Sequence, residues 1–255
     1  MNGVDKLETR KSEIIYGRNP VFELFDSEID VNAVYILKDS PVKSRAAALA
    51  KKKGCSLKEV TAEKLSQFSD GGVHQGIVAT VSAVNYSSLD DIFALAKEKG
   101  EKPMMMLLDS IEDPHNLGAI IRTAECAGAH GVIISKRRSA SVTETVMKTS
   151  AGAALHIPLV RIGNTASTID ELKKRGVWIV GADMDGEDGL RMDYDMPLCL
   201  VIGSEGQGLH RLVREKCDFI ASIPMFGKVN SLNASVAAGI LVYQAVRDRK
   251  VKGGE

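Results

Sequence analysis

The chain has 255 residues, of which 44% are hydrophobic and 26% are charged. These proportions are typical of a globular protein that buries one large core or two modest ones. Lysine plus arginine and aspartate plus glutamate balance at 33 each. No net charge draws the protein onto nucleic acid, so any RNA contact must be local.

The cysteines and the N-terminus indicate the compartment. Cys55, Cys126, Cys199 and Cys217 form no Cys-x-x-Cys pair, which favours buried, reduced thiols over disulfides or a metal site. The N-terminus is charged, and no apolar run approaches the roughly 20 residues of a membrane span. We therefore expect a cytoplasmic protein that binds neither membrane nor metal.

The first 85 residues predict a small mixed α/β domain. Its expected elements are a short helix opened by Asn19-Pro20, a strand at 33–37, a helix at 40–53, a strand at 55–60, a helical turn at 61–65 and a strand at 76–84. Residues 86–103 predict a helical linker that ends at Gly100 and Pro103.

From Met104 onward, strands and helices alternate. Met104–Leu108 is a continuous apolar run, as expected for a strand buried on both faces of a parallel sheet. Further strands are expected at 131–134, 156–160, 177–182, 198–202 and 219–223, and helices at 117–127, 142–149, 167–175 and 231–247. This alternation predicts a domain at 104–255 with helices on both faces of a parallel sheet. Its ligands should bind at the carboxyl ends of the strands.

A glycine-rich segment, 203–208, follows one of these strands. Its main-chain groups would suit an adenine or a ribose, although a plain connecting turn is the alternative. The spacing Gly-x-x-Gly-x-Gly is not the dinucleotide fingerprint, and Gly227-Lys228 lacks the flanking residues of a phosphate loop. Dinucleotides and triphosphates are therefore poor candidate ligands, and the missing fingerprint argues against a nucleotide-dependent oxidoreductase.

Five polar residues near the strand ends also have purely structural interpretations. Asn116 and Ser231 stand where helix N-caps are expected, and Asn233 would then be incidental in the first turn of the last helix. Arg122 could pair with a glutamate three residues further on, worth about 0.2–0.5 kcal/mol. Glu205 near a helix start is favoured by the helix dipole. Residue types alone leave these alternatives open.

Taken together and in order, the segments 116–124, 201–209 and 220–237 resemble the three signature motifs of the SpoU (TrmH-type) RNA 2′-O-ribose methyltransferases. The resemblance implies that S-adenosylmethionine is the methyl donor. By position, it implies that the catalytic and RNA-facing residues are Asn116, Arg122, Glu205, Ser231 and Asn233, and that the donor contacts Gly203, Ile223 and Leu232.

The first domain carries Tyr16-Gly17-Arg18-Asn19-Pro20-Val21 and His74-Gln75-Gly76-Ile77. These segments resemble the ribosomal-protein-like substrate-binding domain of the family, which places the chain nearest the 23S rRNA guanosine-2′-O enzymes. The resemblance further implies a C-terminal trefoil knot and a homodimer whose active site draws on both subunits. A tRNA ribose methyltransferase and a noncatalytic RNA-binding or ribosome-assembly protein remain alternatives.

The implied reaction transfers a methyl group from a sulfonium to a ribose hydroxyl. Such a hydroxyl is a weak nucleophile, so the site must align it and help its proton leave. An arginine with a pKa above ~12 is a poor free base. We therefore expect Arg122 to bind the neighbouring phosphate and polarise the hydroxyl. Ser231 and Asn233 would fix the ribose, and Glu205 would orient Arg122 or Asn116.

Overall fold

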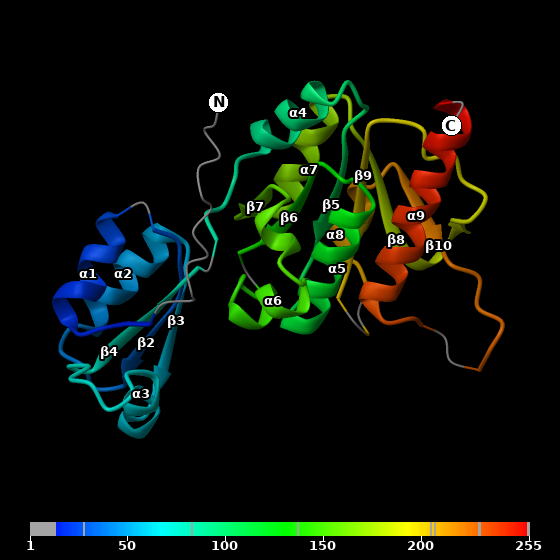
Figure 1. Ribbon diagram of the computed structural model, residues 1–255. Helices are drawn as coiled ribbons and strands as arrows, with labels where there is room; N and C mark the ends of the chain where they lie inside the picture. Colours follow the sequence, from blue (N-terminus) through cyan, green and yellow to red (C-terminus); the bar gives the residue numbers. More distant parts are fainter. Residues whose placement is uncertain are drawn as a thin grey trace. The chain divides into compact units, whose positions relative to one another are not determined.

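The computed structural model describes residues 14–27, 29–82, 84–136, 138–204, 206, 208–228 and 231–253. They form two compact units (Figure 1). The first comprises the described residues up to Asn85 together with Ser141–Glu144, and the second comprises Tyr86–Ala140 and the residues from Thr145 onward.

The first unit is built on a mixed four-stranded sheet in the order β1-β4-β2-β3. The strands are β1 (Ile14–Tyr16), β2 (Val31–Leu37), β3 (Ser56–Val60) and β4 (Ile77–Val81), and the helices are α1 (Arg18–Asp26), α2 (Lys43–Lys53) and α3 (Ala62–Phe68). Helices α1 and α2 share a core with Val34 and Ile36 of β2. Tyr35, between them, faces the other way and stacks on Phe68 of α3, with ring centroids 4.4 Å apart. The predicted mixed α/β domain is confirmed.

The second unit contains a six-stranded sheet in the order β10-β8-β9-β5-β6-β7, and every neighbouring pair is parallel. The strands are β5 (Met104–Leu108), β6 (Gly131–Ser135), β7 (Leu159–Ile162), β8 (Trp178–Asp188), β9 (Leu198–Ile202) and β10 (Phe219–Ser222). Strands β5, β6 and β9 are completely buried, as their continuous apolar runs predict.

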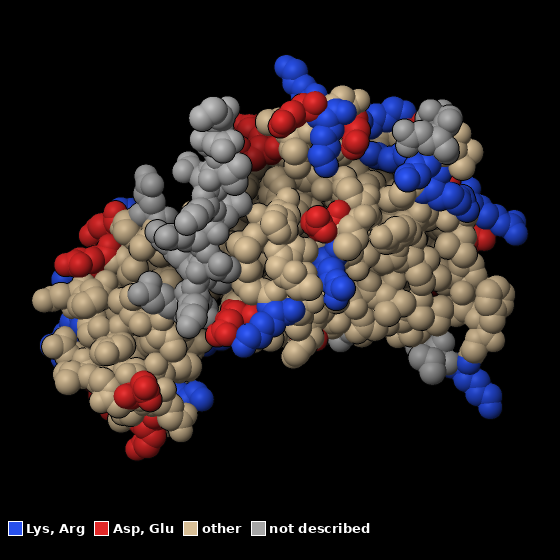
Figure 2. Space-filling view, in the orientation of Figure 1, with Lys and Arg blue, Asp and Glu red and all other residues tan. Residues whose placement is uncertain are grey.

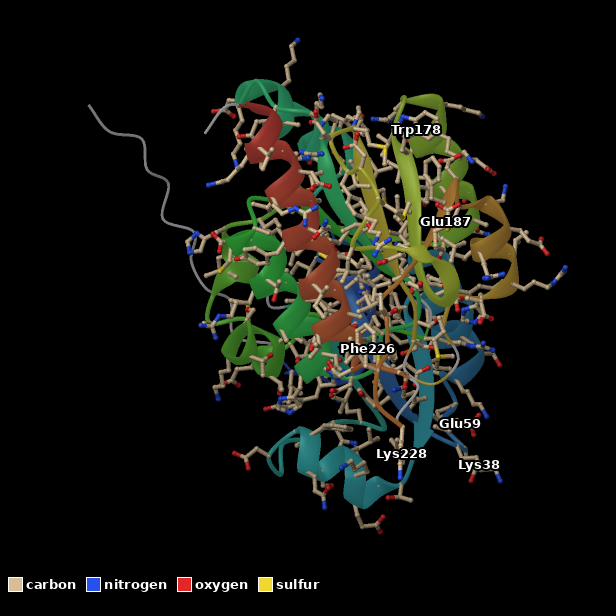
Figure 3. The ribbon with its side chains drawn as sticks, turned by 90° about the vertical axis from the view of Figure 1, so that its right-hand side faces the viewer. Lys38, Glu59, Trp178, Glu187, Phe226 and Lys228 are labelled. Atoms are coloured by element: carbon tan, nitrogen blue, oxygen red, sulfur yellow. The ribbon has the colours of Figure 1, made fainter. Side chains whose placement is uncertain are left out.

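Helices cover both faces of this sheet (Figures 1 and 3). They are α4 (Leu89–Glu98), α5 (Pro114–Cys126), α6 (Glu144–Thr149), α7 (Thr165–Lys174), α8 (Arg211–Lys216) and α9 (Ala234–Gly253). Side chains of α4, α7 and α8 share one core cluster with the alternate β5 residues Met105 and Leu107. Helices α5 and α9 pack against each other on the opposite face. The predicted parallel sheet between two helical layers is confirmed.

The segment predicted to be a linker, 86–103, contains helix α4. A Ser88–Asp91 capping box begins this helix, and its Ile92 is fully buried in the core of the second unit. A Cβ placed on Gly131 of β6 would lie 2.4 Å from Ile92, so the helix fits closely against the strand. Helix α4 is thus an integral layer of the second unit.

Two predicted helix caps are wrong. Helix α5 begins earlier than expected, and its N-cap is Asp113, whose carboxylate accepts from the main-chain N of His115 at 3.1 Å and of Asn116 at 3.3 Å. At the start of α9, Asn233 Oδ1 accepts from the N of Ser235 at 2.9 Å, so Asn233 rather than Ser231 is the cap. Asn116 therefore lies inside the first turn of α5.

Three smaller differences concern a 3₁₀ turn, a short helix and the burial of the cysteines. A 3₁₀ turn occupies Ala153–Leu155, so β7 begins at Leu159 rather than near residue 156. The short helix α8 was not expected. Of the four cysteines, all free, Cys199 is buried and Cys126 is exposed on α5, whereas Cys55 and Cys217 are partly exposed. The expectation of buried thiols thus holds fully for Cys199 alone.

The last turns of α9 are held by the segment between β8 and β9. Gln244 donates to the carbonyl of Leu190 at 2.8 Å, and Arg249 donates to the carbonyls of Met196 at 2.7 Å and Lys102 at 2.7 Å. The C-terminal helix thereby joins the start of β5 to the approach to β9. The trefoil knot implied by the resemblance stays a prediction.

Within the described residues, no helix combines the length and the apolar character that crossing a membrane requires.

A buried histidine makes the second unit sensitive to acid. His130 is completely buried at the start of β6. Its Nδ1 accepts from the N of Met104 at 3.0 Å, and its Nε2 lies 3.0 Å from a carboxylate oxygen of Glu101. Nε2 therefore carries the single ring proton. Burial lowers the pKa of His130 below its usual value of 6.5.

We expect the free energy of unfolding to fall as the pH drops through about 6.5, because the unfolded chain then binds a proton that the folded chain does not. Above that pH the contribution is fully present. Thermal melting between about pH 7.5 and pH 5 measures the effect. His130→Asn, which cannot titrate, should flatten the dependence, whereas His156→Asn at an exposed position should not. Equal slopes in wild type and His130→Asn would contradict this assignment.

Candidate active site

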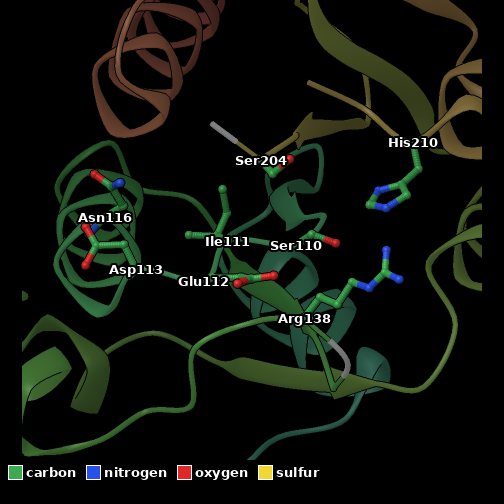
Figure 4. A pocket seen from close by; sticks show the side chains of 8 residues that line it. All are labelled: Ser110, Ile111, Glu112, Asp113, Asn116, Arg138, Ser204 and His210. Carbon is green, nitrogen blue, oxygen red and sulfur yellow. The ribbon is translucent and has the colours of Figure 1, made fainter. Parts of the chain in front are cut away.

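A pocket of about 590 Å³ opens where β5, β6 and β9 end (Figure 4). Its lining residues are Ser110, Ile111, Glu112, Asp113, Asn116, Arg138, Ser204 and His210. The chain builds β6 and β7 on one side of β5 and places the later strands β8, β9 and β10 on the other. The pocket therefore lies at the point where the strand order reverses, the usual ligand site of open parallel sheets.

Two asparagines 117 positions apart meet beside this pocket. Nδ2 of Asn233 donates to Oδ1 of Asn116 at 3.0 Å. Oδ1 of Asn233 accepts from the first turn of α9, which fixes the orientation of its amide. Asn116 is 8% exposed and lines the pocket from α5. The pair joins two of the three motif segments at one point.

Gly203 occupies a tight turn directly after β9. Ser204 and Gly208 exchange main-chain hydrogen bonds of 3.1 and 3.0 Å across this turn. A Cβ on Gly203 would lie 2.3 Å from the main-chain carbonyl of Gly208. The turn thus requires glycine, whatever it binds.

The other two predicted donor contacts lie at the same edge of the sheet. Ile223 follows β10 and is partly buried, whereas Leu232, two residues before α9, is 36% exposed. Phe226 and Lys228 are on the connection between them (Figure 3). Gly203, Ile223 and Leu232 therefore offer main-chain groups and partly exposed apolar side chains.

Arg122 lies apart from this pocket within one chain. It is exposed on α5, six residues beyond Asn116, and at about 100° per residue it projects roughly 120° away from Asn116. It makes no hydrogen bond or ion pair with another residue in the described part of the chain, Glu125 included. The ion pair between Arg122 and Glu125, which is the structural interpretation of Arg122, is therefore not formed.

Neither of the two remaining predicted catalytic residues, Ser231 and Glu205, is among the described residues that line the pocket. Ser231 is exposed in the segment before α9. Glu205 lies outside the described residues. Of the predicted catalytic set, the structure thus brings Asn116 and Asn233 into contact.

Asp109 and His210 belong to the pocket region but were not predicted. Asp109 is 5% exposed at the end of β5. Its carboxylate accepts from Thr165 Oγ1 at 3.1 Å and lies 3.0 Å from Nδ1 of His210. A polar residue directly after the apolar run of β5 is the signal that could have drawn attention to Asp109.

Among the described residues, no cluster of three or more histidine, cysteine, aspartate or glutamate side chains could hold a metal ion.

In the first unit, the segments 16–21 and 74–77, which carry the resemblance to the substrate-binding domain, contact each other. The main-chain N of Arg18 donates to Oε1 of Gln75 at 3.0 Å, and Nε of Arg18 donates to the carbonyl of Gln75 at 3.3 Å. Gln75 has a positive φ of 51°, which a non-glycine residue rarely adopts. The two segments are thus held together across the sheet.

This fold and site define an α/β enzyme whose ligands bind at the carboxyl edge of a parallel sheet. Residues 103–243 match the SpoU rRNA methylase family, and residues 14–87 match the RNA 2′-O ribose methyltransferase substrate-binding family. The chain belongs to the SpoU family. It is accordingly an S-adenosylmethionine-dependent RNA 2′-O-ribose methyltransferase.

Similar proteins extend over most of the chain. A Bacillus subtilis protein assigned to the TrmH family of tRNA/rRNA methyltransferases is 47% identical, covering 96% of this chain and 99% of its own length. The crystal structure of an AdoMet-bound rRNA methyltransferase from Sinorhizobium meliloti is 28% identical, with a TM-score of 0.60, covering 93% of this chain and 87% of its own. A tRNA-modifying TrmH/SpoU enzyme from A. aeolicus is 29% identical, with a TM-score of 0.55, but covers only 60% of this chain and 78% of its own.

The closed turn at Gly203 predicts how a substitution affects donor binding. Gly203→Ala should weaken S-adenosylmethionine binding about tenfold or more, because the added Cβ forces Gly203 and Gly208 apart. Calorimetry on the full chain measures the affinity, and thermal melting checks that the variant is folded. Gly163→Ala is the matched control, since nothing lies within 4 Å of its Cβ. Unchanged donor affinity in folded Gly203→Ala would show that this turn does not bind the donor.

Proposed function

We propose that the substrate is a guanosine of 23S rRNA, methylated on its ribose 2′-hydroxyl. The observation that supports rRNA is the presence of the first unit. The S. meliloti rRNA methyltransferase covers 93% of the chain, whereas the A. aeolicus tRNA-modifying enzyme covers 60%. A substrate-binding unit that accompanies the catalytic unit therefore favours rRNA over tRNA as the substrate.

The domain 1–85 is proposed to bind the substrate RNA, and 104–255 is proposed as the catalytic domain. The segment 86–103 connects them in sequence, and its helix α4 packs into the catalytic domain. Residues 1–85 hold twelve basic and eleven acidic residues, so their net charge cannot drive strong unspecific RNA binding. Recognition should depend on local groups such as Arg18 and Gln75 and on the shape of a folded RNA loop.

Gly203, Ile223 and Leu232 are proposed to hold S-adenosylmethionine. The closed turn at Gly203 offers main-chain groups, and the partly exposed side chains of Ile223 and Leu232 offer apolar contact. When bound, the cofactor supplies a methyl group on a positively charged sulfur. The chain itself must therefore hold the ribose in line with that methyl group and exclude water.

The asparagine pair is proposed to position the target ribose. Asn116 lines the pocket, and its carbonyl oxygen accepts from Asn233. Cap bonds to α9 hold Asn233 in turn, so neither amide can rotate without losing a hydrogen bond. Ser231 and Glu205 are proposed to support the ribose and to orient Arg122 or Asn116, respectively. The resemblance alone supports these last two roles.

Arg122 is proposed to act on the active site of a second copy of the chain. It is exposed and lies outside the pocket of its own chain. Helix α9, which packs on α5, exposes Val236 and Tyr243, 48% and 49% accessible, along one side. Figure 2 shows few charged groups over the central part of the α5 and α9 face. A face with few charges suits burial in a homodimer.

The direct test of the substrate is a map of ribose methylation. RNA from cells with and without the gene is compared over all rRNA and tRNA positions. Loss of one 2′-O-methylguanosine in 23S rRNA is the expected result. Loss of a tRNA methylation instead, or no change at any 23S rRNA position, would contradict the rRNA assignment.

Arg122→Ala should reduce methyl transfer by orders of magnitude while folding and donor binding stay nearly unchanged, because an exposed, unpaired side chain contributes little to stability. Arg122→Lys should be nearly as inactive, since it keeps the charge but loses the planar fork. Single-turnover methylation of an rRNA fragment measures the rate. Near-normal transfer by Arg122→Ala would exclude a catalytic role. Arg211→Ala, an exposed arginine on α8 at the opposite face of the sheet, is a control.

A mixture of two inactive variants tests whether the site is shared between subunits. Arg122→Ala and Asn116→Ala chains, co-expressed, form mixed dimers in which one of the two sites has both residues intact. Random pairing should then restore about one quarter of the wild-type activity. If Arg122 served its own chain, the mixture would stay inactive.

A further inference from the structure

The pocket extends well beyond the asparagine pair. Asn116 and Asp113 line one side of it, whereas Arg138 and His210 lie on the other side and point into it (Figure 4). Neither Arg138 nor His210 belongs to the three motif segments on which the proposed mechanism depends. A volume of about 590 Å³ is within the range of sites for small ligands.

His210 is held in one orientation by a buried acid. The Asp109 carboxylate lies 3.0 Å from Nδ1 of His210 and also accepts from the main-chain N of His210 at 3.4 Å. Thr165 Oγ1 donates to the second carboxylate oxygen at 3.1 Å. Because Nδ1 must donate to the carboxylate, Nε2 is the ring nitrogen left to meet a ligand in the pocket.

Arg138 is held in an unusual backbone conformation. Its φ is 51°, and that of Ser110, which also lines the pocket, is 66°. Such left-handed conformations cost free energy in non-glycine residues and gather at ligand sites. The Arg138 side chain is exposed and makes no hydrogen bond or ion pair with another residue that the structure describes. Its five N–H groups are therefore available to a ligand.

We propose that Arg138 and His210 bind a phosphate group of the nucleotide whose ribose lies at Asn116. This inference rests on the proposed function in that it takes the Asn116 side of the pocket as the ribose site. The guanidinium of Arg138 carries one positive charge, which matches the single negative charge of a phosphodiester. Arg138 donates its planar fork to two phosphate oxygens, and Nε2 of His210 donates to one of them.

The acidic lining residues do not oppose this assignment. Both carboxylate oxygens of Asp113 accept hydrogen bonds from the first turn of α5. Glu112 is exposed, so solvent screens its charge. Asp109 is bound to His210 and Thr165, and so it orients the imidazole without competing for Arg138. Asp109 is thus a positioning residue.

The test uses guanosine and uridine, each as the nucleoside, the 3′-monophosphate and the 5′-monophosphate. Binding to the full chain, saturated with S-adenosylmethionine, is measured by NMR of labelled histidines. For both bases, at least one monophosphate should bind about tenfold or more tightly than its nucleoside, since charge-assisted hydrogen bonds are the strong ones. Arg138→Ala and His210→Ala should each reduce this preference substantially, and the double variant should reduce it to within about twofold.

Arg211→Ala is the matched control. Arg211 is adjacent to His210 in sequence but pairs with Glu215 at 2.8 Å on the surface, so its loss should leave the phosphate preference unchanged. Asp109→Asn should lower the preference and shift the His210 NMR signals, whereas a merely structural role would leave those signals in place. Donor affinity and thermal melting establish that each variant is folded.

Two results would overturn the proposal. One is equal affinity of the wild type for nucleosides and monophosphates. The other is loss of guanosine but not uridine binding in Arg138→Ala, which would show that Arg138 reads the guanine edge. Failure of the proposed methylation is separable, because nucleotide binding is measured without turnover and methylation is followed on rRNA.

Discussion

The amide hydrogen bond between Asn116 and Asn233 is the contact on which the site depends. Asn116 lies in the first turn of α5, the helix after the first strand of the catalytic sheet, and Asn233 caps α9. One 3.0 Å bond therefore ties the opening and closing segments of the second unit together beside the pocket. Because Asn233 also caps α9, the start of that helix and the geometry of the site cannot vary independently.

Much of the sheet was predictable because buried parallel strands leave a strong local signal. Strands β5 and β9 begin and end where their continuous apolar runs predicted. The helix starts were less predictable, since Asp113, Asn116, Ser231 and Asn233 are all good caps by residue type. Which of them caps is decided by main-chain geometry at the pocket. The packing of α4 likewise depends on Gly131, 39 residues after Ile92, and no local pattern reveals it.

The site was predictable only in part, for a similar reason. The resemblance indicated Asn116 and Asn233 together, and the structure brings them into contact. It did not indicate that Arg122 points away from that pocket in its own chain, since helical phase relative to a fold is a tertiary property. Asp109 and His210 were missed because 101 positions separate them and neither residue type is distinctive by itself. Pairs of this kind become visible only when strand ends meet.

The hydrogen bonds that Arg249 donates to the carbonyls of Lys102, Pro103 and Met196 have a consequence for biosynthesis. The first unit depends almost entirely on residues made early, so it can fold while the rest of the chain is still being translated. The second unit needs its C-terminal helix to fasten the beginning of β5. The emerging polypeptide would thus gain its substrate-binding unit first, and its catalytic unit would be complete only once α9 has been made.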